Sequence, residues 1–450
     1  MPWENDHRRP EPRQISLFTG QSPRDRTIER AAKIMISSMS ALAALQHPSS
    51  AFRQYRLSNG IHLVVYSMPQ LHTTAIGFWV RHNSGQFGIH QPGYAHFLEH
   101  LLFRGNENLD SRGLLQEFER FGGRSNAFTD REFSVLYGTV PSALQADLFD
   151  VFADMILEPR FTLKDFEIEK EIVRREIEES NTLADDAIED FAIEHIWQNH
   201  PLGWPVLGSW YDIDAISFDE ITAYHEQIRD IHPLWVVAAG KVDFDRLAVA
   251  MERLAGLPPR QPCSLQPPVF NSRVLTLNRG LSRCQMLWAM PAPTHGQRRF
   301  WACQLANHIL AGSAASRLQA ELGTRRNILT QLTTRIEPYS NAGLWLFTGF
   351  CRRYAARKCL RRVDEIVTEF CTSGPSQEEL SGARQALSAR LQLEQDDPDA
   401  TMERIAREFI YDGSVATTAE LLADIASVTA SEVRDTACAA WQRRTIVEWS

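Results

Sequence analysis

The sequence has few cysteines, no long apolar run and no excess of basic residues. Each of these absences excludes a class of protein. The seven cysteines among its 450 residues are an odd number, show no C-x-x-C spacing and all lie at or after Cys263. A disulfide framework and a zinc ribbon are therefore excluded, and reduced thiols in an intracellular protein are expected. No apolar run reaches the roughly 18 residues that a transmembrane helix needs. For that reason we expect no membrane contact, and because the net charge is −9 we expect no nucleic-acid partner.

Residues 1–50 lack the pattern of a targeting segment. The first 30 are polar and mix proline with charges of both signs, which predicts disorder. Residues 34–45 are apolar but lie too far from Met1 for a signal peptide, so we prefer an accessory helix. Five acidic residues speak against an organellar presequence, namely Glu4, Asp6, Glu11, Asp25 and Glu29. We expect a bacterial cytoplasmic protein, in preference to one of the mitochondrial matrix or the periplasm.

The remaining residues are numerous and apolar enough to form two cores. Hydrophobic residues make up 44% of the chain and charged residues 23%, as in globular proteins, and 450 residues exceed one ordinary domain. Residues 258–268 contain five prolines, which predicts a linker. We predict an N-terminal extension at 1–50, a first domain at 51–257, a linker at 258–272 and a second domain at 273–450.

The two halves show a similar order of expected elements. Short strands precede a helix, a hairpin follows, and further helices come after it. The strands expected are 55–66 (two, around an Asn-Gly turn), 73–80, 124–129, 132–140 and 235–240 in the first half, and 273–277, 285–290, 328–336 and 343–350 in the second. This order predicts an α+β fold in which two homologous domains each pack helices on a mostly antiparallel sheet.

Residues His96 to His100 read H-F-L-E-H, the inverted form of a zincin motif. Imidazoles four residues apart lie on one face of a helix and are good ligands for divalent zinc. Glu99 projects near such a metal without having to bind it, which suits a general base acting on water. Roughly one chain in a hundred of this composition carries the pattern by chance, so a structural pair of histidines is the alternative.

A catalytic zinc site needs a third protein ligand, and a charged helix predicted at 161–179 offers candidates. Its glutamates are Glu167, Glu169, Glu171, Glu176, Glu178 and Glu179. Glu169 and Glu176 are two helical turns apart and share a partly apolar face, so one could bind metal while the other supports it. The alternative is that these carboxylates are solvated, as most of them must be.

Five blocks carry a resemblance to a known family, namely LSNGIHLVV, GYAHFLEHLLFRGNE, SNAFTDREFSVLY, FEIEKEIVRREIEE and HPLGWPVLG. From Leu57 to about Val242 the chain resembles the N-terminal domain of the pitrilysin (insulysin) family of zinc metallopeptidases, the inverzincins. The resemblance is greatest to small two-domain members, of the mitochondrial processing peptidase type and the bacterial peptide-precursor-processing type. In this family the third ligand lies about 75 residues after the second histidine, and 75 residues separate His100 from Glu176.

The resemblance implies one Zn²⁺ per chain, bound by His96, His100 and Glu176. It implies that Glu99 is the catalytic base and that Glu169 supports the ligands. It further implies a peptide substrate that adds as a strand along Asn126, Ala127, Phe128 and Thr129. The alternative for this last segment is that Asn126 only serves a turn.

The second domain departs from the family pattern. Residues 309–350 resemble the family's second domain, and AGSAASRLQAEL resembles its turn and helix. In active single chains and homodimers of the family, an Arg and a Tyr separated by six residues follow this segment and stabilise the tetrahedral intermediate. Those positions are Gly323 and Thr330 in this sequence, and neither can do that work. Arg404 and Tyr411 have the spacing but lie far along the chain, so a surface Arg and a helix-end Tyr are the preferred interpretation.

The resemblance therefore implies half of an active site. We predict the zinc-bearing catalytic subunit of a heterodimeric endopeptidase, whose metal-free homologous partner supplies the Arg and Tyr. The two subunits would enclose a chamber for peptides or unfolded precursor segments. One alternative is a non-catalytic core-type subunit of a larger complex, which usually loses its zinc ligands. Another is a self-sufficient homodimer, in which Arg404 and Tyr411, or Arg325 and Arg326, replace the missing pair.

Overall fold

The computed structural model describes residues 51–82, 91–182, 184–261, 265–278, 280–281 and 283–450. All of them belong to one compact unit, Gln46–Ser450. The extension predicted at 1–50 lies outside the described residues. Within them, no helix has the length and apolar character needed to cross a bilayer.

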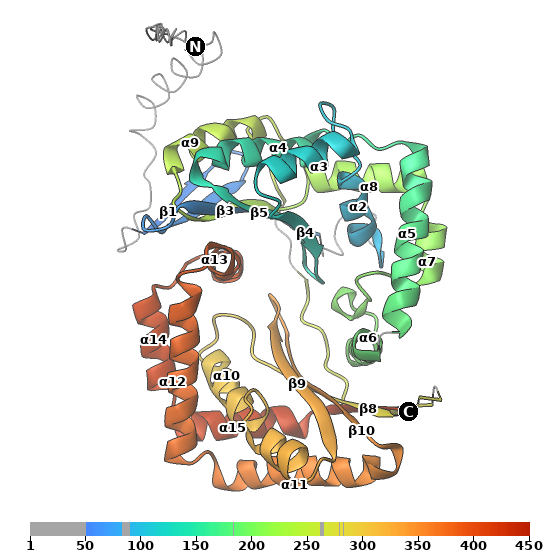
Figure 1. The fold of residues 1–450 in the computed structure, drawn as a ribbon, viewed down its shortest axis with the longest axis vertical. Helices are drawn as coiled ribbons and strands as arrows, with labels where there is room; N and C mark the ends of the chain where they lie inside the picture. The colour runs from blue at the N-terminus through green and yellow to red at the C-terminus, as the bar shows by residue number, and fades with distance from the viewer. Residues whose placement is uncertain (1–50, 83–90, 183, 262–264, 279, 282) are drawn as a thin grey trace, which may run out of the picture. The chain divides into compact units, whose positions relative to one another are not determined.

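The first half of this unit is built on a six-stranded sheet (Figure 1). Its strands are β1 (Phe52–Arg56), β2 (His62–Ser67), β3 (Thr73–Arg81), β4 (Ser125–Thr129), β5 (Phe133–Pro141) and β6 (Leu234–Gly240). Their order is β1-β2-β6-β3-β5-β4, and every neighbouring pair is antiparallel except β2 and β6. β4 is thus an edge strand, held on one side only by β5.

The second half is built on a five-stranded sheet of the same design. Its strands are β7 (Val274–Leu277), β8 (Cys284–Pro291), β9 (Leu329–Pro338), β10 (Gly343–Cys351) and β11 (Thr445–Trp449), in the order β7-β11-β8-β10-β9. This sheet order repeats β2-β6-β3-β5-β4 of the first sheet when β7 to β11 are matched with β2 to β6 in turn. The parallel pair β7/β11 then corresponds to the parallel pair β2/β6. The predicted fold class, two homologous domains with mostly antiparallel sheets, is therefore confirmed.

Helices cover one face of each sheet. In the first half they are α2 (Tyr94–Leu102), α3 (Ser111–Arg120), α4 (Gln145–Leu157), α5 (Leu163–Thr182), α7 (Trp210–Ala215), α8 (Phe218–Asp230) and α9 (Phe244–Ala250). In the second half they are α10 (Arg299–Leu310), α11 (Ala356–Ser373), α12 (Gln377–Glu394), α14 (Thr418–Ser427) and α15 (Ala430–Gln442). The first of these cores contains aromatic contacts, in which Phe78 of β3 packs on Phe149 and Phe152 of α4.

Each half gives one helix to the opposite sheet. α13 (Pro398–Asp412) packs on β3 and β6 of the first sheet, where Met402 and Ile405 are buried with Trp79. α6 (Ala184–Ile196) packs on β8 and β11 of the second sheet, where Ile188 and Ile193 are buried. Since β8 and β11 correspond to β3 and β6, the exchange is reciprocal. It buries the face of each sheet that its own helices leave uncovered.

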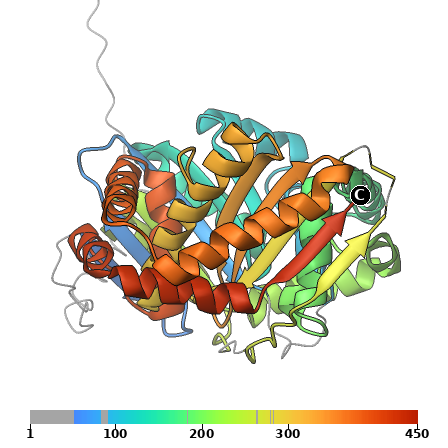
Figure 2. The same ribbon diagram turned by 90° about the horizontal axis from the view of Figure 1, so that it is seen from below.

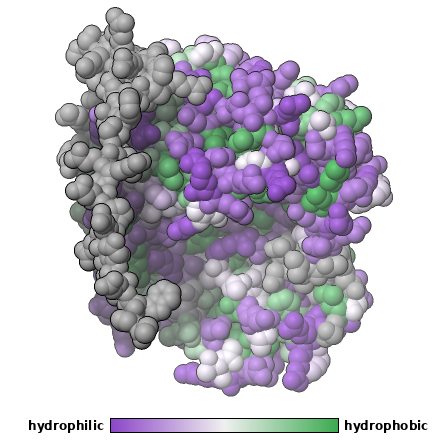
Figure 3. Space-filling view, turned by 45° about the horizontal axis from the view of Figure 1, so that its top comes forward, coloured by the Kyte–Doolittle hydropathy of each residue, from purple (hydrophilic) through white to green (hydrophobic). Residues whose placement is uncertain are grey.

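Residues 430–449 form elements that the sequence patterns did not predict. Figure 2 shows α15 leading into β11, which lies beside β7. β11 has only five residues and pairs with strands more than 150 positions earlier, so no local turn marks it. α9 ends at Ala250 and is followed by a 3₁₀ turn, Met251–Leu254. The face drawn in Figure 3 is mostly hydrophilic, with apolar residues in small separate patches.

Candidate metal centre

The H-F-L-E-H segment lies on α2, and the start of that helix requires a glycine. Gly93 precedes it with a φ of 83°, and a Cβ there would approach Leu207 O to 2.8 Å. α2 buries Phe97, Leu98 and Leu101 in the first core. His96, Glu99 and His100 therefore point from the remaining face and are only half-buried.

α5 lies against α2 and brings two glutamates to that face. Phe166, Val173 and Ile177 are buried and fix the rotation of α5 on the core. Glu169 is 6% exposed and Glu176 is half-buried, whereas Glu167, Glu171 and Glu178 are exposed. Packing of the apolar stripe thus separates the two inward glutamates from the solvated ones.

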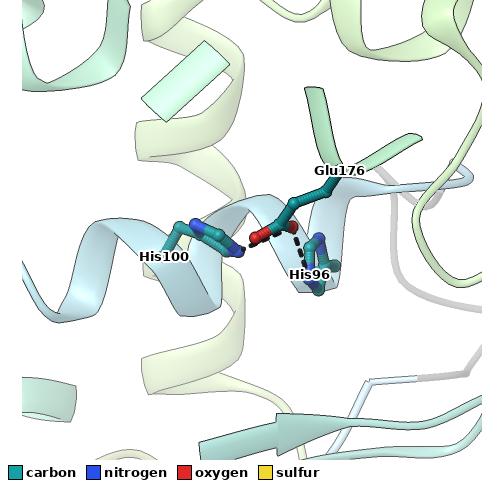
Figure 4. Close-up of side chains that lie close together, drawn as sticks. All are labelled: His96, His100 and Glu176. Carbon is teal, nitrogen blue, oxygen red and sulfur yellow. Dashed lines mark ion pairs between the residues drawn. The ribbon is translucent and has the colours of Figure 1, made fainter. Parts of the chain in front are cut away.

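His96, His100 and Glu176 come together with their ligand atoms within 4.8 Å of one another. Glu176 Oε2 is 3.7 Å from His96 Nε2 and 3.4 Å from His100 Nε2, and its carboxylate points toward both rings (Figure 4). Ligands about 2.1 Å from a tetrahedral zinc ion are about 3.4 Å apart. Two imidazole nitrogens and one carboxylate oxygen at this spacing fit a zinc ion with a further position for water.

Glu169 and Arg104 stand behind His100. His100 Nδ1 lies 2.9 Å from Glu169 Oε2, and Arg104 Nε donates to Glu169 Oε1 at 2.5 Å. With Nδ1 engaged by a carboxylate, His100 presents Nε2 to Glu176. The structure thus places Glu169 where a supporting carboxylate would act. It adds Arg104, a residue the sequence reasoning missed although it lies one helical turn after His100.

Burial and neighbouring charges shift the pKa values of the two histidines in opposite directions. Burial, assisted by the charge of His100, lowers the pKa of His96 to about 3. Burial also tends to lower the pKa of His100, but its bond to Glu169 and the nearby carboxylates outweigh this and raise it. His96 Nδ1 is buried and has no hydrogen-bond partner in the described residues. His96 is therefore a neutral imidazole whose Nε2 faces Glu176, as metal ligation requires.

Glu99 is held by the hydroxyl of Thr129. Thr129 Oγ1 donates to Glu99 Oε2 at 2.5 Å and lies 3.1 Å from Ser134 Oγ, directly across the β4/β5 pair. Burial raises the pKa of Glu99, and the bond from Thr129 opposes that rise. A carboxylate with a raised pKa and one fixed oxygen can exchange a proton through the other oxygen.

The proposed substrate segment, Asn126 to Thr129, is most of the edge strand β4. Asn126 is exposed, and Ala127, Phe128 and Thr129 are half-buried. Asn126 Oδ1 accepts a hydrogen bond from Ala127 N, so its side chain does serve the local backbone. Among the described residues no strand pairs with the outer edge of β4, so this edge has the form that strand addition needs.

The residues considered in the second half lie in fixed structural positions. Gly323 lies in a π-helix, Gln319–Arg325, and Thr330 Oγ1 donates to Phe350 O. Arg404 pairs with Glu408, and Tyr411 donates to the buried Glu132 at 2.8 Å. Both of these last two residues are on α13, which packs on the first sheet. Arg325 and Arg326 both pair with Glu321.

Sequence comparison identifies the family to which this arrangement belongs. Residues 63–209 match the family described as insulinase (peptidase family M16), and residues 215–387 match the peptidase M16 inactive domain. The fold and the His-His-Glu cluster are those of a zinc-peptidase class, and the chain belongs to peptidase family M16. This confirms the resemblance to the pitrilysin (insulysin) family.

Individual relatives extend over most of the chain. An uncharacterized zinc protease of Mycobacterium tuberculosis is 27% identical over 390 residues, covering 85% of this chain and 89% of that protein. The uncharacterized zinc protease YmxG of Bacillus subtilis is 23% identical over 383 residues, which cover 85% of this chain and 93% of that protein. The homologues are thus named as zinc proteases.

Solved structures share the fold at low sequence identity. A peptidase M16 inactive domain from Pseudomonas fluorescens has a TM-score of 0.80 at 16% identity, covering 88% of this chain and 98% of its own. A protease from Helicobacter pylori has a TM-score of 0.79 at 17% identity, and the match covers 89% of this chain and 99% of that protein's chain. At these identities the likeness shows the two-domain fold alone.

Proposed function

We propose that this chain is a zinc-dependent endopeptidase, with zinc held by His96, His100 and Glu176. The observation that carries the proposal is the meeting of these three ligand atoms within 4.8 Å, one residue from a half-buried carboxylate, Glu99. The names of the homologues support it, because they are called zinc proteases. When bound there, zinc supplies Lewis acidity that polarises the scissile carbonyl and acidifies water at the site.

The chain's own residues carry out the proton transfers and hold the substrate. Thr129 bonds to Oε2 of Glu99, so Oε1 accepts the proton of the attacking water. Glu99 then passes this proton to the leaving amine. A peptide lies extended along β4, where backbone hydrogen bonds hold any sequence and side chains set the preference. Glu169, itself bonded to Arg104, keeps His100 oriented throughout.

The active enzyme in this proposal is a heterodimer that cleaves peptides or unfolded precursor segments in an enclosed chamber. Gly323 and Thr330 stand where the family's Arg and Tyr belong, so a homologous metal-free subunit must supply them. Arg404 and Tyr411 are already engaged by Glu408 and Glu132, which weakens the homodimer alternative. The six cysteines that the structure describes are free thiols, in keeping with the proposed cytoplasmic location.

Co-expression of this chain with a homologous subunit that lacks H-x-x-E-H and carries the Arg and the Tyr tests this function. We expect the zinc-loaded pair to cleave an unfolded polypeptide and this chain alone to be inactive. Glu99→Gln should reduce turnover by at least about 100-fold without loss of zinc, since general-base catalysis contributes that much. Undiminished cleavage by Glu99→Gln would exclude Glu99 as the base, and full activity of the chain alone would exclude the heterodimer.

A further inference from the structure

The second half contains a structural counterpart of the metal centre. α10 corresponds to α2 in chain order, and both helices end two residues after a histidine, His308 and His100. Aligned from these ends, H-F-L-E-H-L-L of α2 matches Q-L-A-N-H-I-L of α10, beginning at Gln304. α10 packs on α12 and β9 just as α2 packs on α5 and β4.

One hydrogen bond of the metal centre is repeated in this counterpart. Thr129 of the edge strand β4 bonds to Glu99, and Thr334 of the edge strand β9 donates to Asn307 Oδ1 at 2.5 Å. Asn307 is the residue that aligns with Glu99. The amide therefore takes the place of the candidate base and holds the same contact with the neighbouring sheet.

The third ligand position carries the opposite charge in the second half. Glu176 is the fourteenth residue of α5, and Arg390 is the fourteenth residue of α12. A guanidinium therefore replaces the carboxylate, and Gln304 replaces His96. This set of side chains cannot hold a divalent cation but suits an anion.

A cavity of about 410 Å³ lies over these residues. Gln304, Asn307, His308 and Arg390 all line it, and no acidic side chain is among its described lining residues. Arg390 is exposed and forms no ion pair with any residue that the structure describes. Arg390 is thus a cation without an ion-pair partner among the described residues, and the cavity that it lines has no acidic lining residue.

Asn307 is oriented as a hydrogen-bond donor to this cavity. Trp345 Nε1, which can only donate, lies 2.7 Å from Asn307 Oδ1. Because Thr334 also donates to Oδ1, the Nδ2 hydrogens remain to serve a ligand. A guanidinium fork and an amide NH₂ group are the donors that a carboxylate accepts well.

Two further cavities lie between this one and the candidate active site. A cavity of about 540 Å³ is lined by Thr129 and by Pro338, Glu403 and Arg407, and the last three also line a cavity of about 770 Å³. That cavity in turn shares Gln304 and Arg390 with the 410 Å³ cavity. Successive cavities that share lining residues thus extend from Thr129, the partner of Glu99, to Arg390.

The other charges near these cavities are largely paired. Glu403 pairs with Arg407, Glu408 with Arg404, and Asp412 with His295. Glu394, one turn after Arg390 on α12, has a pKa raised by burial, which the charges of Arg390 and Arg404 oppose. Glu394 and Arg390 thus interact through their charges and line the same cavity of about 770 Å³, but they form no ion pair within the described residues.

We propose that Arg390 and Asn307 form a second binding site, which takes a carboxylate of the substrate peptide. The carboxylate is either the free C-terminus or an Asp or Glu side chain, since both have the same chemistry. The site selects acidic peptides and anchors them away from the bond to be cleaved. This inference rests on the proposed peptidase function for the identity of its ligand.

Peptide binding to the full-length Glu99→Gln chain, loaded with zinc, tests the site without cleavage. The probes are three short peptides of one neutral sequence, each with a neutral dansyl group at its N-terminus. The first has a free C-terminus, the second a C-terminal amide, and the third a C-terminal amide and one internal Glu. Arg390→Gln is the test variant. Arg357→Gln is the matched control, because Arg357 is exposed on α11, away from the cavity.

We expect Arg390→Gln to weaken binding of at least one carboxylate-bearing peptide about 10-fold or more, the value of a charge-assisted hydrogen bond. The neutral amide should bind Arg390→Gln as it binds the control. Loss confined to the first probe assigns the site to a C-terminus, and loss confined to the third assigns it to a side chain. Three results would overturn the inference. The Arg390→Gln variant could bind every probe as tightly as the control does, its affinity could fall equally for all three probes, or no probe could bind the parent chain. Zinc content and cleavage, measured separately, decide the proposed function whatever these peptides do.

Discussion

At the scale of single residues, two groups of the candidate metal centre are oriented by neighbours: His100 by Glu169, which Arg104 bonds in turn, and Glu99 by Thr129. The spacing of H-F-L-E-H predicts two ligands and a base on one helical face. Glu176 and Glu169 followed from the family resemblance, because several glutamates of α5 offered the same chemistry. Arg104 and the hydroxyl of Thr129 could not be predicted, since their partners lie 65 and 30 residues away in the chain. Only the packing of α2 on α5 and β4 reveals these contacts.

Arg104 should tune zinc affinity through Glu169 and His100. We expect Arg104→Met to weaken zinc binding about 10-fold to 100-fold, the usual effect of losing a partner behind a ligand. Competition with a chromogenic chelator measures it. Arg112→Met, at an exposed position of α3, is the control and should leave the affinity unchanged. Equal affinities of the two variants would show that the Arg104–Glu169 bond has no role at the metal.

Thr129 should affect turnover through its hydroxyl rather than its shape. Thr129→Val keeps the volume and removes the donor to Glu99, so we expect kcat to fall about 10-fold with KM little changed, as for loss of one hydrogen bond to a charged group. Thr129→Ser should restore most of the rate. Steady-state kinetics of the assembled enzyme distinguish this from a substrate-binding role, for which KM would rise instead.

At the scale of elements, α13 is tied to the turn between β4 and β5. Glu132 in that turn is fully buried and accepts hydrogen bonds from Arg81, Ser340 and Tyr411. The Ser340 contact comes from the turn between β9 and β10, so one carboxylate joins elements of both sheets. The location of α13 could not be predicted from the sequence, because an amphipathic helix gives no sign of which sheet it will cover.

Tyr411→Phe should destabilise the folded chain. It removes a donor from a buried carboxylate, and we expect the free energy of unfolding to fall by about 1–3 kcal/mol. Tyr354→Phe, at a residue that is 81% exposed, should change it by less than about 0.5 kcal/mol. Urea denaturation of both variants gives the comparison. Similar values for the two would mean that the contact with Glu132 contributes nothing.

At the scale of the whole described unit, the two halves are coupled by the exchange of α6 and α13. Hydrophobic patterning and the proline-rich stretch indicated two halves of similar element order, and the sheets bear this out. The exchange and the strand β11 depend on contacts between distant segments, which periodicity cannot report. Because each sheet needs a helix from the other half, neither half can bury its core alone.

Mutations in the exchanged helices should therefore lower one common unfolding transition. We expect Ile405→Ala in α13 and Ile193→Ala in α6, both almost fully buried, each to cost about 2–5 kcal/mol. Calorimetry should show a single peak that moves down in both variants. Leu393→Ala, at a residue that is 73% exposed, is the control. Two separate peaks, with only one displaced by each variant, would contradict the coupling.

The metal content of the purified chain tests the zinc site most directly. Mass spectrometry of the acid-digested protein should find one zinc per chain, falling to near zero in both His100→Ala and Glu176→Ala. His308→Ala, at the corresponding position of the second half, should keep the full zinc content. Zinc absent from the native chain, or retained undiminished by the His100 and Glu176 variants, would contradict a zinc site formed by His96, His100 and Glu176.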